Sequence, residues 1–308
     1  MRINTVTGEI PSENLGVTLT HEHIICRCEP FYGALGEAFF DRKRTVELSV
    51  RYLKHMKEKY KLQTMVDATV LNLGRDLDLL KEVSEKSEVY ITSSTGLYWN
   101  YEPMVDRKSE NSLAELFLLD AKAKKPALLK CAAENEQTVS YSKKLLSSLV
   151  KVQKETGLPI YVHTNANLLG KDIAEYVVSI GADTNKITVG HLSDISDVQP
   201  LLDIASFGLY IGLDRLRDDD AYLDKNVQYV KTLVEKGYEN KILLSHDAII
   251  YSDFSPDDSK YQKENPDESR FTVLFRKFIP KLRNAGIPDS IINRIITENP
   301  RKMLEAGR

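Results

Sequence analysis

The sequence predicts an α/β fold, a (β/α)8 barrel of the TIM type that forms a single domain over residues 1–308. Three observations lead to this prediction. Short apolar runs rich in β-branched residues recur along the chain, a longer amphipathic segment follows each run, and no linker rich in Pro, Gly or Ser interrupts the alternation. Alternating strands and helices are typical of a parallel sheet buried on both faces. Eight such repeats favour a closed barrel, which commonly forms one domain at this length.

The predicted strands are the apolar runs themselves. In chain order they are Val17–His23, Thr64–Thr69, Val89–Thr95, Ala127–Ala132, Pro159–Thr164, Ile187–His191, Gly208–Leu213 and Ile242–His246. The first ten residues precede them and predict an opening strand and turn.

The predicted helices are the longer segments between the strands. Residues 44–60, 76–87, 140–156 and 226–237 place apolar side chains three and four positions apart, the pattern of a helix that covers a sheet. Residues 271–286 and 290–307 predict two closing helices. The stretch Tyr251–Ser269 is irregular and polar, and it has the length of an active-site loop after the eighth strand.

The composition is ordinary for a soluble globular protein, with 42% hydrophobic and 28% charged residues. A net charge of −3 argues against a nucleic-acid-binding protein, which would carry a basic surface. The sequence shows neither an apolar run of about 18 residues nor a signal peptide. Three cysteines (Cys26, Cys28 and Cys131) fit a reducing compartment. We therefore expect a cytoplasmic protein that binds neither nucleic acid nor membrane.

The histidines gather at one end of the predicted strands. Five of the six, namely His21, His23, His163, His191 and His246, lie near the C-terminal end of a predicted strand, whereas His55 lies in a predicted helix. The C-terminal strand ends of a barrel converge in space, and active sites form there. We therefore expect these imidazoles to lie close together.

The pair His21 and His23 is the clearest metal-binding pattern. Alternate residues of a strand point the same way, so both imidazoles face the barrel interior and Glu22 faces out. Two imidazoles aimed at one point suit a divalent ion such as Zn2+. The alternative is a pair of hydrogen-bonded core histidines, which the other strand-end histidines make less attractive.

Lys130 ends an apolar strand that should point into the barrel, where an isolated ammonium is costly. Three interpretations compete. The amine could form a Schiff base with a carbonyl substrate, or pair with Asp247 or Glu134. It could also be carboxylated by CO2 to a carbamate that bridges two metal ions. The surrounding histidines favour the carbamate, because a Schiff-base enzyme does not need them.

Asp247 follows the eighth strand and is the candidate catalytic residue. A carboxylate there can ligate a metal ion and accept a proton from bound water. A helix N-cap is the alternative, but residues 248–254 are a poor helix start.

At these residues the sequence resembles the phosphotriesterase-like lactonase family of the amidohydrolase superfamily. The matching segments run in order from residue 15 to 247 and are LGVTLTHEHI, VDATVLNLGRD, STGLY, ALLKCA, PIYVHTNA, ITVGHLSD, IGLDR and LLSHD. Each segment alone is weakly informative, whereas the ordered set is specific and covers nearly the whole chain.

The resemblance implies a binuclear metal centre. His21, His23 and Asp247 would hold one ion, His163 and His191 the other, and carboxylated Lys130 would bridge them. The ions would be Zn2+, with Mn2+, Co2+ or Fe2+ as alternatives. A hydroxide shared by the ions would attack the substrate while one ion polarises it, and Asp247 would take the proton.

The resemblance also indicates the substrate. In lactonase relatives a tyrosine and an arginine placed like Tyr98 and Arg215 lie beside the substrate, which favours a lactonase. Tyr98 could instead be a packed rim residue, and Arg215 could pair with Asp214 or Asp218.

The polar loop after the eighth strand favours a small polar lactone, such as a sugar lactone with or without a phosphate group. Arg27, Arg215, Arg217 and Lys260 are candidate phosphate contacts, because guanidinium groups match phosphate geometry; each could also be a solvated surface charge. Phosphotriester or phosphodiester hydrolysis is the main alternative function, and a Schiff-base lyase and a non-enzymatic binding protein are two further ones. The expected partner is a small molecule, and relatives suggest a homodimer.

Overall fold

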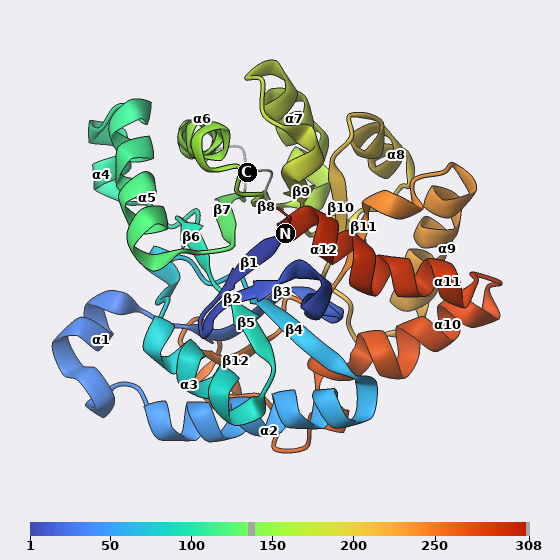
Figure 1. The fold of residues 1–308 in the computed structure, drawn as a ribbon, viewed down its shortest axis with the longest axis horizontal. Coiled ribbons are helices and arrows are strands. Elements are labelled where there is room, and N and C mark those ends of the chain that lie inside the picture. The colour runs from blue at the N-terminus through green and yellow to red at the C-terminus, as the bar shows by residue number, and fades with distance from the viewer. Residues whose placement is uncertain (135–138, 306–308) are drawn as a thin grey trace.

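The computed structural model describes residues 1–134 and 139–305, and it shows an α/β fold in which helices surround parallel strands (Figure 1). The strands form two parallel sheets and one antiparallel hairpin. The six-stranded sheet has the order β11 (Ile242–Leu244), β10 (Tyr210–Leu213), β9 (Ile187–Val189), β8 (Ile160–Thr164), β7 (Leu128–Ala133) and β6 (Ser94–Gly96). The four-stranded sheet has the order β12 (Ile249–Ser252), β3 (Val17–Cys26), β4 (Leu62–Asp67) and β5 (Tyr90–Thr92).

All eight predicted strands are present, and two predictions need correction. The third strand is split at Ser93 into β5 and β6, one in each sheet. The eighth ends at Leu244, and a further strand, β12, follows it and includes the first two residues of the predicted irregular loop, Tyr251 and Ser252. β12 pairs in parallel with β3, Ile249 lying opposite His23. The chain thus passes from one sheet to the other at two points.

The N-terminal hairpin and the C-terminus cover one end of the strands. β1 (Arg2–Thr5) and β2 (Gly8–Pro11) pair as the predicted strand and turn. Ile3 packs in one buried cluster with Met303 and with Leu128, the first residue of β7. The ends of the strands where the histidines lie are therefore the opposite, carboxyl ends.

The long helices follow strands in the chain and lie outside the sheets (Figure 1). They are α2 (Arg42–Tyr60), α3 (Leu77–Ser87), α5 (Glu110–Lys124), α6 (Val139–Thr156), α7 (Ala166–Ser179), α8 (Gln199–Ser206) and α9 (Asp220–Glu235), and two short ones are α1 (Glu29–Leu35) and α4 (Pro103–Arg107). Side-chain caps fix several starts. Asp76, for example, caps α3 by accepting from the backbone N–H of Leu79 at 3.0 Å.

The two closing helices are present, and each contains a wider π-helical turn. Leu274–Phe278 is π-helical before α10 (Ile279–Asn284), and Arg294–Glu298 is π-helical between α11 (Asp289–Asn293) and α12 (Asn299–Leu304). Both α10 and α12 have a proline at their start, Pro280 and Pro300. Proline has no backbone N–H and clashes with the carbonyl four residues earlier, so the wider turn accommodates it.

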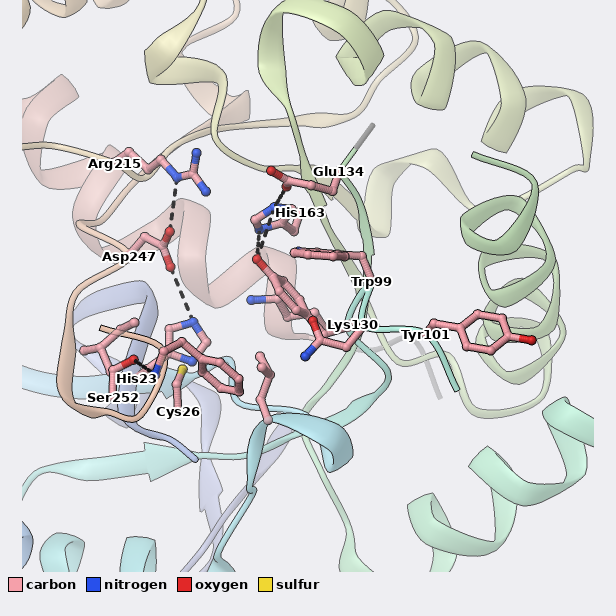
Figure 2. Close-up of a pocket in the computed structure, with 15 residues that line it drawn as sticks. His23, Cys26, Trp99, Tyr101, Lys130, Glu134, His163, Arg215, Asp247 and Ser252 are labelled. Atoms are coloured by element: carbon pink, nitrogen blue, oxygen red, sulfur yellow. Dashed lines mark hydrogen bonds and ion pairs between the residues drawn. The ribbon is translucent and has the colours of Figure 1, made fainter. Parts of the chain in front are cut away.

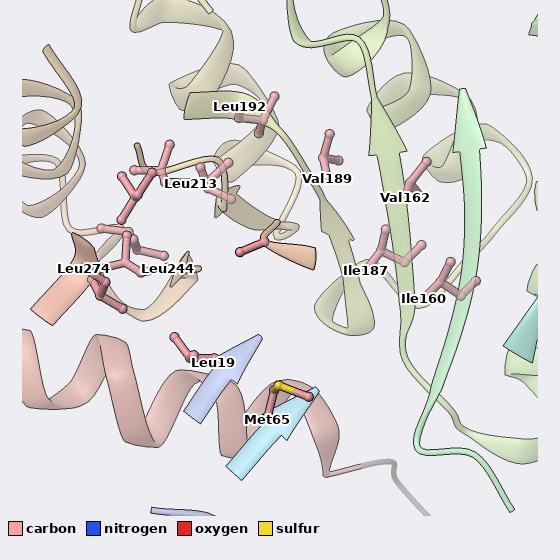
Figure 3. Packing of buried hydrophobic residues seen from close by; sticks show 14 of the residues in the cluster. Leu19, Met65, Ile160, Val162, Ile187, Val189, Leu192, Leu213, Leu244 and Leu274 are labelled. Carbon is pink, nitrogen blue, oxygen red and sulfur yellow. The ribbon is translucent and has the colours of Figure 1, made fainter. Parts of the chain in front are cut away.

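The hydrophobic core lies between the strands and the helices (Figure 3). Strand β8 illustrates how side chains alternate between the two faces of the sheet. Ile160 and Val162 belong to this core, whereas the alternate residues Tyr161 and His163 point to the other side of the sheet. Strand alternation therefore turns apolar residues towards the helices and leaves the other face free for polar ones. None of the helices in the described residues is long and apolar enough to cross a membrane.

Candidate metal centre

Six polar side chains from five strands meet at the carboxyl ends of the strands. His21 and His23 lie on β3, Lys130 on β7 and His163 on β8, while His191 and Asp247 follow β9 and β11. The four imidazoles and Lys130 are almost completely buried. Figure 2 shows His23, Lys130, His163 and Asp247 converging on the same space. The sequence predicted this convergence.

The backbone turns sharply at two of these residues. His191 and Asp247 have φ of 63° and 51°, in the left-handed region that residues other than glycine rarely adopt. Backbone hydrogen bonds hold both turns: the N–H of His191 donates to Asp214 Oδ1 at 2.7 Å, and that of Asp247 donates to His21 O at 3.1 Å. Because β12 follows, the structure rejects the alternative that Asp247 caps a helix.

Asp247 faces histidines with both of its oxygens. Its Oδ1 lies 3.5 Å from His21 Nε2 and 3.4 Å from His23 Nε2. Its Oδ2 lies 3.7 Å from His191 Nε2, and that nitrogen is 2.6 Å from His163 Nδ1. Among the described residues, one ligand atom from each of His21, His191 and Asp247 lies within 4.8 Å of the other two. We call His21 and His23 the first ligand group and His163 and His191 the second ligand group, which is the division that the family resemblance implies; the three-residue cluster spans both.

The hydrogen-bond partners assign the tautomer of each imidazole in the first ligand group. His21 Nδ1 lies 2.9 Å from the carboxylate of Asp214, which can only accept. His23 Nδ1 lies 2.9 Å from Thr69 Oγ1, and that hydroxyl donates to Ile25 O. In the neutral rings, both Nδ1 atoms therefore carry the proton, and both Nε2 atoms offer a lone pair.

The second ligand group is assigned in the same way. His191 Nδ1 lies 3.0 Å from Asp214 Oδ1, and His163 Nε2 lies 2.6 Å from Glu134 Oε2. The facing atoms, His191 Nε2 and His163 Nδ1, are then the nitrogens available to a metal ion, and at 2.6 Å they can share a proton when no ion is bound. This donor set of imidazole nitrogens and carboxylate oxygens fits a divalent metal ion.

Two of the imidazoles, His21 and His163, are neutral beside a charged carboxylate. Burial, together with nearby Lys130, lowers the pKa of His21 to about 3. Burial and the neighbouring His191 lower the pKa of His163 well below its usual value. Burial opposes ionisation of Asp247, yet the adjacent histidines hold its pKa well below the usual range. Neutral imidazole and ionised carboxylate are the forms that bind metal ions.

His23 differs from these two imidazoles in its charge. Burial also opposes protonation of His23, but the neighbouring Cys26 and Asp247 outweigh it and raise the pKa of His23 to about 10. His23 therefore offers its Nε2 lone pair only after the binding ion displaces a proton.

Lys130 lies within this group of ligands. Its Nζ is 2.6 Å from His21 Nε2, and burial lowers its pKa. A neutral amine is the form that reacts with CO2 or with a carbonyl. Gly96 lets the strand approach Lys130 closely: its φ is 134°, and a Cβ there would lie 1.8 Å from the carbonyl oxygen of Lys130. Glu134, one of the two carboxylates predicted as a possible partner of Lys130, contacts His163.

Glu22 and His246 support the backbone around the metal centre. Glu22 is fully buried and accepts hydrogen bonds from Ser245 Oγ, His246 N, His246 Nδ1 and Ala248 N, at 2.7 to 3.0 Å. The N–H of Leu274 donates to His246 Nε2 at 3.0 Å. Both ring nitrogens of His246 are thus used by Glu22 and Leu274, so His246, although it was expected beside the other strand-end histidines, has a structural role, and Glu22 has the partner that a buried carboxylate needs.

A cavity of about 580 Å3 opens beside the ligands (Figure 2). Its walls mix polar site residues with aromatic and aliphatic ones. The lining residues are His23, Cys26, Leu73, Tyr98, Trp99, Asn100, Tyr101, Lys130, Glu134, His163, Arg215, Asp247, Ile249, Ser252 and Phe254. Such a volume suits a small organic molecule.

Tyr98 and Arg215 both line this cavity. The hydroxyl of Tyr98 lies 3.4 Å from each ring nitrogen of His163. Arg215 donates from Nε to Asp247 Oδ2 at 3.1 Å and from Nη1 to Asp194 Oδ2 at 3.3 Å. The alternative ion pairs of Arg215 with Asp214 or Asp218 are therefore replaced by pairs with Asp247 and Asp194.

Three predicted substrate contacts are not among the described residues that line the cavity, namely Arg27, Arg217 and Lys260. Arg27 is buried, its guanidinium lies 3.4 Å from the ring centre of Tyr32, and it bonds to Glu29. Contact of these three residues with a phosphate stays a prediction.

Arg217 pairs with Asp194 at 3.0 Å and lies over the ring of Tyr222. The backbone carbonyl of Lys260 accepts from Ser252 N at 2.8 Å.

Several residues of the site were not predicted from the sequence. Trp99, Phe254 and Ile249 line the cavity, and Thr69 and Asp214 contact the histidines. Asp214 carried a recognisable signal, because it directly follows a predicted strand just as Asp247 does. The aromatic residues carried none, since only the folded arrangement of the loops brings them to the site.

The chain is similar to hydrolases over nearly its whole length. The sequence model of the phosphotriesterase family matches residues 1–304. A "Phosphotriesterase homology protein" of Mycobacterium tuberculosis (strain CDC 1551 / Oshkosh) is 28% identical over 321 residues, covering 98% of this chain and 97% of the relative. An "Aryldialkylphosphatase" of Saccharolobus solfataricus is 29% identical over 317 residues, covering 98% and 99%. An "N-acetyltaurine hydrolase" of Xenopus tropicalis is 25% identical over 353 residues, covering 98% and 97%.

Proposed function

The chain belongs to the phosphotriesterase family and is a metal-dependent hydrolase, and on this basis we propose that it is a lactonase with a binuclear metal centre. The observation that carries the proposal is the position of Tyr98 and Arg215. They line one cavity, and each contacts a metal-ligand candidate, His163 and Asp247 respectively. A small ester bound in this cavity next to the metal centre therefore has both polar groups among its neighbours.

The first ligand group and Asp247 would hold one ion, the second ligand group would hold the other, and Lys130, carboxylated, would bridge them. Zn2+ is the proposed ion, with Mn2+, Co2+ and Fe2+ as alternatives. When bound, such ions supply a hydroxide at neutral pH and polarise the substrate carbonyl.

The side chains of the cavity supply the remaining chemistry. Asp247, ionised and in contact with both ligand groups, accepts the proton of the attacking water and passes it to the leaving alkoxide. Tyr98, whose pKa burial raises, stays protonated and donates a hydrogen bond to the ester. Arg215 orients the ring substituents of the lactone from the opposite side.

The proposed substrate is a small polar lactone, such as a sugar lactone with or without a phosphate. Arg215 is the lining residue that can meet an anionic substituent, because a guanidinium pairs readily with phosphate. Asn100 and Ser252 offer hydrogen bonds to hydroxyl groups. Trp99 and Phe254 form an apolar wall against which a sugar ring can pack.

Phosphoester hydrolysis at the same centre is the second candidate. The likeness to an aryldialkylphosphatase over 98% of the chain favours it. A metal ion can polarise an ester carbonyl and a phosphoryl oxygen in the same way. The shape and polarity of the cavity, and not the metal ligands, must therefore determine which of the two substrates is hydrolysed.

One assay separates the candidates. The metal-analysed protein is tested on five-carbon sugar lactones with and without a 5-phosphate, on homoserine lactones, on paraoxon and on N-acetyltaurine. Fast, chelator-sensitive opening of one lactone class with two ions per chain supports the proposal. Faster hydrolysis of paraoxon would move the function to phosphoesters, and equal turnover of both sugar lactones would remove the phosphate from the substrate.

Three architectural features belong to the same proposal. The strands form a closed (β/α)8 barrel, since β5 and β6 are halves of one strand and β12 continues β11. The chain folds as one domain over residues 1–308. Two copies form a homodimer, which light scattering of the purified protein tests.

A further inference from the structure

We infer that Asp214 is a positioning residue that couples the two halves of the metal centre, because its one carboxylate holds a histidine of each ligand group. The inference rests on the proposed binuclear centre. Asp214 directly follows β10, and its side chain is fully buried. The sequence suggested only a pairing of Asp214 with Arg215, whereas the ion pairs of Arg215 among the described residues are with Asp194 and Asp247.

Four hydrogen bonds converge on this carboxylate. Its Oδ1 accepts from the backbone N–H of His191 at 2.7 Å and from His191 Nδ1 at 3.0 Å. Its Oδ2 accepts from His21 Nδ1 at 2.9 Å and from the hydroxyl of Tyr161 at 2.5 Å. The donors come from three segments, β3, β8 and the end of β9, so Asp214 connects parts of the chain that are far apart in sequence.

An ionised carboxylate can only accept hydrogen bonds. Both contacted Nδ1 atoms must therefore be the protonated nitrogens, and the Nε2 atoms of His21 and His191 must both be free for a metal ion. A carboxylate behind a metal-binding imidazole also fixes the ring orientation and makes the nitrogen more basic. Asp214 exerts this effect on both ligand groups at once.

The other two histidines have partners of their own. Thr69 holds His23 of the first ligand group at 2.9 Å, and Glu134 holds His163 of the second at 2.6 Å. Among the hydrogen bonds of the described residues, the carboxylate of Asp214 is thus the contact shared by both groups. Substitutions of Asp214, Thr69 and Glu134 should therefore weaken metal binding in three different patterns: at both ions, at the first ion only and at the second ion only.

The test measures binding of Zn2+ to the metal-free full-length chain by calorimetric titration, with Co2+ absorption spectra as a second readout. Asp214→Ala should weaken both binding steps by about 10–100-fold, the usual cost of removing a residue that orients a metal ligand. Thr69→Val and Glu134→Ala are the matched controls, and each should weaken one step while leaving the other within about threefold of wild type.

The conservative variant Asp214→Asn sharpens the test. Its amide has one accepting oxygen where the carboxylate has two. It can therefore accept a hydrogen bond from Nδ1 of His21 or of His191, but not from both. It should therefore spare one binding step and weaken the other. This variant also keeps the inference testable if Asp214→Ala does not fold, which circular dichroism of the metal-free protein would reveal.

The outcomes are distinguishable. Wild type that binds two ions, with Asp214→Asn binding both as tightly as wild type, would overturn the coupling role and leave the proposed function standing. Loss of a single step in Asp214→Ala would also overturn it. Wild type that binds fewer than two ions would instead overturn the binuclear proposal on which the inference rests.

Discussion

The guanidinium of Arg215 donates from Nε to Oδ2 of Asp247 at 3.1 Å. This oxygen of Asp247, which faces the second ligand group, therefore also pairs with a cationic side chain of the cavity wall. Asp194 holds the other end of the guanidinium at 3.3 Å, so Arg215 is fixed between two carboxylates. This arrangement places a positive charge beside the proposed proton acceptor, and it makes the arginine testable apart from the metal ligands.

We predict that Arg215→Lys lowers kcat/KM for the lactone about 10–100-fold, because an ammonium cannot keep both contacts of the planar guanidinium. Steady-state kinetics measures the loss, and metal analysis of the same sample should still give the wild-type metal content. A variant with normal kinetics would show that Arg215 contacts no part of the substrate. Arg283→Lys is the control, since Arg283 is half exposed, pairs with Asp289 and is not among the described lining residues.

The hydroxyl of Tyr98 gives a narrower prediction. Tyr98→Phe removes one hydroxyl that lies 3.4 Å from His163 and keeps the aromatic wall. We expect kcat/KM for the lactone to fall about tenfold, the order of magnitude of one hydrogen bond in the transition state. The comparison with paraoxon is informative: an equal loss on both substrates would assign the hydroxyl to the metal centre and not to lactone recognition.

Gly96 should be intolerant of any side chain. Gly96→Ala would place a Cβ 1.8 Å from the Lys130 carbonyl oxygen at a φ of 134°, so either the strand or Lys130 must move. We expect the free energy of unfolding to fall by about 3 kcal/mol or more, with loss of bound metal. Denaturant unfolding and metal analysis report the two effects.

Gly237→Ala is the matched control for Gly96. Its φ is also positive, 80°, but nothing lies within 4 Å of the added Cβ. It should cost about 1 kcal/mol and keep the metal. Equal effects of the two substitutions would mean that the close approach to Lys130 contributes nothing.

Arg75 and Asp120 form a scaffold pair with a predictable pH dependence. Two N–H groups of Arg75 donate to Asp120 at 2.7 Å each. Burial opposes ionisation of Asp120, but Arg75 lowers its pKa below the usual 3.8. A carboxyl group whose pKa is lowered by folding stabilises the protein above its unfolded pKa, and the contribution is lost as the pH falls through the lowered value.

Asp120→Asn should therefore lower the free energy of unfolding at pH 7 by about 3 kcal/mol, since it leaves a nearly buried guanidinium without its charge partner. The difference from wild type should shrink as the pH falls below 3.8. Urea unfolding from pH 7 down to the acid transition measures both. A difference that stays constant with pH would contradict an ionic origin.

Strand positions and the gathering of the histidines could be predicted because both follow from local pattern. A strand buried on both faces is a continuous apolar run, and ligands at the ends of parallel strands must converge. β12 could not be predicted, since Ile249–Ser252 leads directly into a polar loop and its pairing partner, β3, lies over two hundred positions away in the sequence.

The charged residues were harder to place than the ligands. Arg27 stacks on Tyr32, a contact between side chains on a loop and a short helix that no periodicity records. Arg215 was correctly placed at the cavity because it directly follows a residue at the end of a strand, but its partners depend on loops from elsewhere. Tertiary contacts determine where a long flexible side chain lies, whereas the strand itself determines the direction in which a ligand side chain on it points.

The position of Asp247 at the joint between β11 and β12 separates two kinds of evolutionary change. The residues before the joint belong to the buried scaffold, whereas Ile249, Ser252 and Phe254 after it contribute three side chains to the cavity wall. Ile250 and Tyr251, between the first two of these, are buried in the core. Substitutions confined to the three lining positions can therefore reshape the cavity while β12 and the ligands keep their places, so related enzymes can act on different esters with one metal centre.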